Sequence, residues 1–123
     1  MSNIIKEILY ECIKKCNECI EHCSSMEHMI DCVNTCSDCI KCCNLCLDYN
    51  FTNKELYDYL LNMCIRACDL CINACNIHSD NIFCKRCIIA CMECIKTCKN
   101  NLYSINNKYM KYKTKYLKLK NNF

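Results

Sequence analysis

Cysteine and aliphatic side chains recur every three or four residues through most of the chain, with polar side chains between them. In a helix each residue adds 100°, so this spacing gathers the recurring side chains into one stripe, whereas a strand would scatter them onto both faces. The pattern predicts four helices. We place them at roughly residues 3–24, 26–49, 53–77 and 80–100 or beyond.

Polar residues provide capping signals at three of the predicted helix starts. The second helix has a capping box of Ser24 with Glu27, and the third has one of Thr52 with Glu55. Either Ser79 or Asp80 can cap the fourth helix. Gly and Pro are both absent, so very short polar links are expected, and short links make neighbouring helices antiparallel. The expected fold class is all-α, an antiparallel up-down-up-down four-helix bundle with a helical C-terminal extension.

Nineteen cysteines occupy most of the stripe positions. The motif C-x3-C-x2-C-x3-C occurs four times, once in each segment, and the fourth segment has one further cysteine in phase before it. Each motif spans a stripe about 60° wide, at the seam that bundles normally fill with Leu or Ile. By segment, the candidate metal ligands are Cys12, Cys16, Cys19 and Cys23; Cys32, Cys36, Cys39, Cys42, Cys43 and Cys46; Cys64, Cys68, Cys71 and Cys75; and Cys84, Cys87, Cys91, Cys94 and Cys98.

So many cysteines in a short chain would ordinarily suggest a secreted disulfide scaffold. The first residues lack the charged, apolar and small segments of a signal peptide. The spacing also keeps the cysteines of one helix too far apart for a disulfide. No run of about 18 apolar residues predicts a membrane span. We therefore expect a reduced, cytoplasmic protein without membrane association.

Cysteine is much smaller than leucine, so a cysteine stripe leaves a partly hollow core that a metal can fill. Thiolates select Cu(I), zinc or iron–sulfur clusters. A structural zinc site needs only one set of four ligands, and ferredoxin-type clusters use an irregular loop that ends in proline. Cu(I) fits better, because thiolates four residues apart on one helix can share an ion. The expected cargo is multiple Cu(I) ions per chain.

The repeats resemble those of the copper storage protein family, most closely over residues 64–98, CIRACDLCINACNIHSDNIFCKRCIIACMECIKTC, and more loosely over residues 12–98. The resemblance implies a cytosolic four-helix bundle that loads many Cu(I) ions on its C-x3-C pairs. It also implies that copper enters among His and Met residues at one end. His78 matches the first His of the family's His-rich turn, whereas Asn81 and Phe83 stand where the family has further His residues.

The predicted topology gathers His and Met side chains, which are borderline or soft copper ligands, at one end of the bundle. The gathered residues are His22, Met26, His28, Met29 and His78. By helical angle, His28, Met29 and His78 lie on or beside the cysteine stripe, and we predict that these three bind copper at a mouth. His22 flanks the stripe and Met26 points further away. The opposite end should be closed by Ile5, Ile8, Leu9, Leu47, Leu60, Leu61 and Leu102.

Charge divides the chain into two parts, a Cys-lined bundle at 1–100 and a basic Lys/Tyr-rich helical tail at 101–123. The first part carries ten basic and thirteen acidic side chains, and the tail carries six lysines and no acid. Apolar tail residues alternate in steps of three and four, at Leu102, Ile105, Tyr109, Tyr112, Tyr116, Leu119 and Phe123. Such a seam favours pairing with tails of other chains, hence a homo-oligomer, over docking on the bundle; nucleic acid is a weaker alternative. The tail also resembles those of giant-virus proteins, which implies virion packaging or targeting.

These observations predict Cu(I) storage or sequestration that buffers or detoxifies cytosolic copper, with exchange to a copper chaperone or low-molecular-weight thiols. Zinc buffering, a thiol redox or disulfide-linked structural protein, and an interaction protein with cysteine as filler remain alternatives. No Ser/His/Asp set, paired catalytic carboxylates or open metal site with a general base emerges, so an enzyme is not expected.

Overall fold

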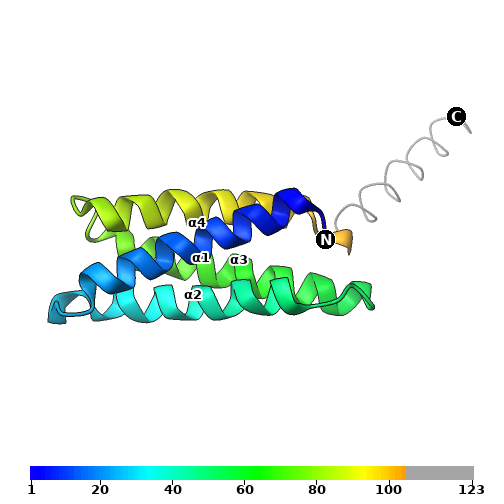
Figure 1. The fold of residues 1–123 in the computed structure, drawn as a ribbon, viewed down its shortest axis with the longest axis horizontal. Coiled ribbons are helices and arrows are strands. Elements are labelled where there is room, and N and C mark those ends of the chain that lie inside the picture. Colours follow the sequence, from blue (N-terminus) through cyan, green and yellow to red (C-terminus); the bar gives the residue numbers. More distant parts are fainter. Residues whose placement is uncertain (105–123) are drawn as a thin grey trace, which may run out of the picture.

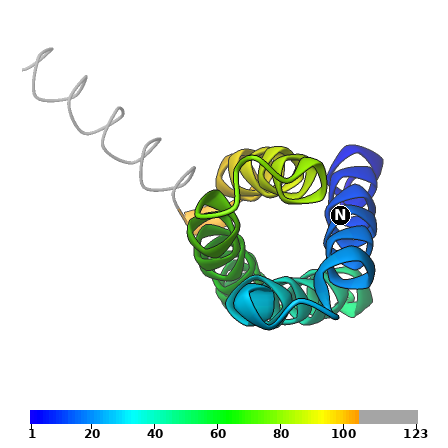
Figure 2. The same cartoon turned by 90° about the vertical axis from the view of Figure 1, so that its left-hand side faces the viewer.

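The computed structural model describes residues 1–104, which form a bundle of long helices (Figure 1). In chain order the elements are α1 (Asn3–Cys23), the 3₁₀ turn η1 (Glu27–Met29), α2 (Ile30–Asp48), α3 (Lys54–Asn76) and α4 (Ile82–Asn100). Helices α1 and α3 each pack against both α2 and α4, and Figure 2 shows the four helices arranged around a common axis. The predicted four-helix bundle is confirmed. Among the described residues, no helix is both long and apolar enough to cross a lipid bilayer.

Side-chain caps begin three of the helices. The Ser2 hydroxyl accepts a hydrogen bond of 3.4 Å from the Ile5 N–H at the start of α1. The Asn53 side chain accepts one of 3.0 Å from the Leu56 N–H at the start of α3. Asn81 accepts hydrogen bonds from the second and third residues of α4, at 2.9 and 3.2 Å.

The capping residues predicted from the sequence are wrong. Ser24 ends α1 instead of starting α2, because its backbone is helical (φ −63°, ψ −23°) and an N-cap needs an extended backbone. Asn53 and Asn81 do have extended backbones and replace Thr52 and the pair 79–80 as caps. Helix α2 follows η1, and neither of these two elements has a side-chain cap.

Cysteine side chains fill most of the bundle core. All of them are buried except Cys42, which is half-buried on α2. At the end of the bundle formed by the start of α1 and the end of α4, aliphatic residues take over, and Ile5, Leu9, Leu61 and Leu102 are buried there. Sequence periodicity alone thus predicted which face of each helix turns inward.

The fourth helix does not run straight on into the tail. Helix α4 ends at Asn100, and the Asn101 N–H bonds back to the carbonyls of Cys98 and Lys99. The chain leaves helical geometry at Leu102 and resumes it at residues 103–104. The fourth helix, which was expected to reach residue 100 or beyond, is therefore interrupted at Leu102. The remaining tail residues, 105–123, lie outside the described part of the chain.

Candidate metal centre

The core sulfur atoms form successive layers to which all four helices contribute. Nearest the η1 end, Cys19 lies 3.6 Å from Cys32 and 4.0 Å from Cys84. The Cys32 sulfur in turn lies 2.8 Å from that of Cys75 and 3.8 Å from that of Cys84. Four thiols, one from each helix, therefore meet in the first layer.

The next layer repeats this arrangement one helical turn deeper. Cys16 and Cys87 are 3.7 Å apart, and Cys36 lies 3.6 Å from both Cys71 and Cys87. The Cys71 and Cys87 sulfurs are also 3.7 Å apart. These contacts join residues that are far apart in sequence, so the fold rather than local helical spacing creates them.

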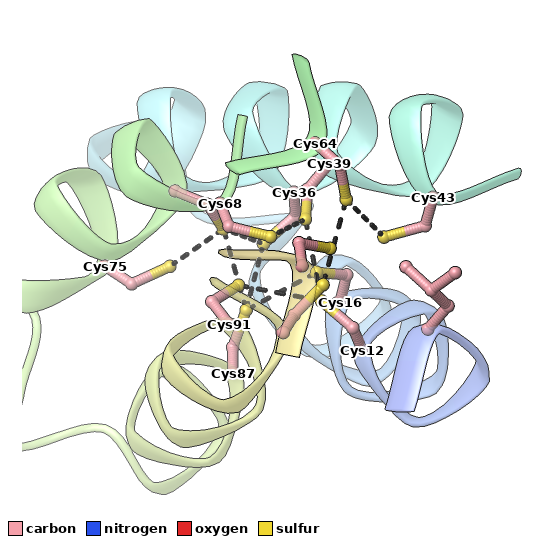
Figure 3. Packing of buried hydrophobic residues seen from close by; sticks show 14 of the residues in the cluster. Cys12, Cys16, Cys36, Cys39, Cys43, Cys64, Cys68, Cys75, Cys87 and Cys91 are labelled. Carbon is pink, nitrogen blue, oxygen red and sulfur yellow. Dashed lines mark hydrogen bonds between the residues drawn. The ribbon is translucent and has the colours of Figure 1, made fainter. Parts of the chain in front are cut away.

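A third layer of thiols lies deeper still. Cys12 lies 3.7 Å from Cys39 and 3.9 Å from Cys91, and Cys39 lies 3.4 Å from Cys68. Figure 3 shows the cysteines from the four helices turning their side chains toward one another in the bundle interior. A continuous run of sulfur atoms thus follows the bundle axis.

The deepest layers contain fewer thiols. Cys64 lies 3.6 Å from Cys43 and 3.7 Å from Cys94. The last thiol of α2, Cys46, donates a hydrogen bond of 3.3 Å to the Leu60 carbonyl. The density of soft ligands therefore falls toward the aliphatic end.

The layers share members, so they form one ladder. Within each group below, the sulfurs lie within 4.8 Å of one another. The groups are Cys19, Cys32, Cys75, Cys84; Cys19, Cys36, Cys75, Cys87; Cys16, Cys71, Cys87, Cys91; Cys12, Cys16, Cys39, Cys91; and Cys12, Cys43, Cys94. Bonds on the order of 2.3 Å place two sulfurs on opposite sides of one ion ~4.6 Å apart. The ladder therefore suits ions held between neighbouring thiolates, within and between helices.

Burial opposes ionisation of the thiols around the core. It raises the pKa of Cys23, at the η1 end, to about 11, and it also raises the pKa values of Cys42 and Cys84. These thiols hold their protons at neutral pH in the metal-free chain. A metal that binds there must displace protons, which couples its affinity to pH.

The structure brings the three predicted non-cysteine ligands to the η1 end of the ladder. The rings of His28 and His78 meet edge to face with centroids 5.6 Å apart, and Met29 is buried beside the core. These side chains come from the α1–α2 and α3–α4 links. The topology therefore brings the three residues to one end of the bundle, whereas a copper mouth formed by His28, Met29 and His78 stays a prediction.

The other mouth residues have different surroundings. The exposed ring of His22 stacks on Phe83 at 4.1 Å. Met26, expected to point away, is partly buried against the core. Phe83 and Asn81 stand where the family pattern has His. In this chain Phe83 stacks on His22, and Asn81 is the N-cap of α4.

Two site features were not predicted. Cys42 was grouped with the stripe, but the structure places it half-buried at a groove between α2 and α3 that Met63 and Leu70 also line. Asp58 is buried at the aliphatic end, where its carboxylate accepts hydrogen bonds from the Tyr103 and Ser104 N–H groups. By helical angle Asp58 lies well to one side of the α3 cysteine stripe, so nothing in the sequence predicted its burial.

Comparison with known proteins identifies a family. Residues 1–103 match the family model described as "Copper storage protein". No curated protein and no solved structure matches the chain. The matched region spans the four helices and every cysteine.

Proposed function

The chain belongs to the copper storage protein family, and we propose that the thiolates of its core ladder are the ligands that hold the copper. Copper is the stored cargo of this family, which has a storage role and not an enzymatic one. The observation that carries the proposal is the sharing of cysteines between successive sulfur groups. A shared thiolate can bridge two ions, which raises the capacity toward one ion per thiolate.

Charge favours Cu(I) over zinc as the cargo of this ladder. Four sulfurs within 4.8 Å would also accept a tetrahedral zinc ion, so distance alone does not select the metal. A zinc ion with four thiolates carries a net charge of −2, and stacked sites would accumulate that charge in a buried core, where unpaired charge is costly. Cu(I) at one ion per thiolate leaves no net charge.

The end of the ladder at η1 is the side from which we propose that copper loads. His28, Met29 and His78 lie there as borderline or soft donors next to the first thiol layer. Aliphatic residues cover the opposite end. Copper would be captured at the mouth and passed inward by exchange between shared thiolates.

The cellular setting follows from the chemistry of the thiols. A ladder of free thiols needs a reducing compartment, for which the cytoplasm is proposed. There a copper chaperone or low-molecular-weight thiols would deliver and withdraw Cu(I) by ligand exchange. Self-association of the chain is the further partner interaction that we propose.

Anaerobic titration of the reduced protein with Cu(I), against a competing chelator, tests the function. We expect saturation well above four Cu(I) ions per chain. The protein should compete with a chelator far less well for Zn(II) than for Cu(I). Saturation at one or two Cu(I) ions, or tighter retention of zinc, would contradict the proposal. Thiol quantification before titration serves as the control, because disulfides would lower the capacity for a trivial reason.

A further inference from the structure

The two halves of the bundle carry opposite net charge. Helices α2 and α3 hold six acidic and three basic side chains, a net charge of −3. Helices α1 and α4 hold five acidic and seven basic side chains, a net charge of +2. The α2–α3 half therefore attracts a basic partner, and the α1–α4 half does not.

The acidic half also presents an apolar stripe. Leu56, Tyr59, Met63 and Leu70 of α3 are 53%, 64%, 45% and 44% exposed. Their spacing of three, four and seven residues places them on one side of the helix. A groove of about 310 Å³ runs beside the stripe between α2 and α3, and Met63 and Leu70 are among its lining residues. Exposed apolar surface with charged borders is typical of a docking site.

The chain itself contains a segment with the complementary chemistry. All six tail lysines lie within residues 105–123, and Tyr109, Tyr112, Tyr116 and Leu119 of that segment recur in steps of three and four. A helix of these 19 residues would be ~28 Å long, against ~21 Å for the stripe from Leu56 to Leu70. The charge of this segment complements the α2–α3 half, and its apolar spacing and length are sufficient to cover the stripe.

The start of the tail indicates which copy supplies the segment. The N–H groups of Tyr103 and Ser104 donate hydrogen bonds of 2.7 and 2.8 Å to the two carboxylate oxygens of Asp58 on α3. In a helix the first N–H groups point back along the axis, toward the N-terminal end. At residues 103–104 the helical backbone therefore leads away from α3, not along it. The groove of the same chain is poorly placed to receive its own tail.

We propose that residues 105–123 of a second copy of this chain dock in the α2–α3 groove, along the stripe of Leu56, Tyr59, Met63 and Leu70. Lysines of the docked segment face the acidic half, and its tyrosines and leucines cover the stripe. The interaction specifies the self-association proposed above. It does not depend on copper binding, so its failure would leave the storage function untouched.

Complementation between full-length variants tests this interaction. A groove variant carries Met63→Lys and Leu70→Lys, and a tail variant carries Tyr112→Glu and Tyr116→Glu. The matched control carries Ile89→Lys and Met92→Lys, two exposed apolar residues of α4. In sedimentation velocity we expect the wild type and the control to associate, and each of the other variants to associate at least tenfold more weakly.

An equimolar mixture of the groove and tail variants should regain association, because one supplies an intact tail and the other an intact groove. Association of the wild type should weaken at 0.5 M salt, since part of the attraction is screened. Failure of the mixture to associate while the wild type does would indicate pairing between tails and overturn the proposal. A monomeric wild type, or association only with added nucleic acid, would overturn it equally.

Alkylation of Cys42 gives an independent reading of the groove. This half-buried thiol is at the groove, whereas the other cysteines are buried in the core. In the wild type, Cys42 should be alkylated several-fold more slowly at protein concentrations above the midpoint of self-association than at concentrations below it. The groove variant should show no such dependence on concentration. A rate that is the same at all wild-type concentrations would overturn docking in this groove.

Discussion

The sulfur atoms of Cys16 on α1 and Cys87 on α4 lie 3.7 Å apart, although 71 residues separate them in the chain. Each belongs to two of the overlapping sulfur groups, and together they connect the groups near the mouth with those deeper in the core. The pair therefore lies on the proposed route of copper from the η1 end to Cys12, Cys43 and Cys94. The pair is a point at which the continuity of the ladder can be tested.

Replacing both residues, Cys16→Ser and Cys87→Ser, should divide Cu(I) loading into a fast and a slow phase. Serine keeps the size of the side chain but is a poor ligand for Cu(I), so ions would transfer slowly to the deeper thiols. The time course of anaerobic Cu(I) loading can be monitored by the ultraviolet absorption of the thiolate-to-copper charge-transfer band. The control variant is Cys42→Ser, because Cys42 lies beside the core, and it should load in one phase. A single unchanged phase in the double variant would show that copper does not travel through Cys16 and Cys87.

Copper should raise the thermal stability of the bundle. A ligand that binds the native state alone stabilises it by about 2.7 kcal/mol per site at a hundredfold excess over its Kd. In a domain of about 100 residues each kcal/mol raises Tm by about 4–8 °C, so even one filled site should raise Tm by more than about 10 °C. Circular dichroism melts of reduced protein with and without Cu(I) measure the change. Equal melting temperatures would show that copper does not bind the folded core.

The triple variant His28→Ala, Met29→Ala and His78→Ala should slow the uptake and removal of Cu(I). Its total capacity should stay nearly unchanged, because the core thiols remain. Transfer to a chelator, followed over time, gives the rates, and the end points give the capacity. Met92→Ala, an exposed methionine on α4, is the control that should change neither quantity. A loss of Cu(I) capacity with unchanged rates of uptake and removal would show that these three residues do not form the copper entrance.

Asp58→Asn should lower the free energy of unfolding by about 1–2 kcal/mol at neutral pH, because the two N–H groups would lose a charged acceptor. Burial opposes ionisation of Asp58, but hydrogen bonds from Ser104 and Tyr103 outweigh it and lower its pKa. Its contribution is thus present above the ordinary carboxyl pKa and is lost as the pH falls through the lowered value.

Urea unfolding of the two proteins across acidic pH measures this contribution. The difference in stability between wild type and Asp58→Asn should shrink as the pH falls below the ordinary carboxyl pKa. The control, Asp69→Asn, removes an exposed ion pair with Arg66 and should cost well under 1 kcal/mol. A difference that stays constant with pH would mean that the carboxylate charge does not hold residues 103 and 104.

The sequence alone predicted which side of each helix faces the core, because helical periodicity is a local property of the chain. A residue's direction around a helix depends only on its position in the repeat, so the stripes that contain Cys12, Cys36, Cys68 and Cys91 could be read directly as a buried thiol core. Cys42 departs from the core because it neighbours Cys43 in sequence, and both cannot face the axis. The caps were misplaced for a comparable reason: Ser24 had the right side chain, but its backbone continues α1.

The cysteine repeats by themselves determined the bundle, the inward thiols and the soft-metal chemistry, since each follows from 100° per residue and the affinity of thiolates. The tertiary structure alone decided which thiols meet. Distances such as that between Cys32 and Cys75, 43 residues apart, depend on how far each helix slides along its neighbours. The same holds for Asp58 and Tyr103: the carboxylate is on α3, the N–H follows α4, and only the register between the two helices brings donor and acceptor to 2.7 Å.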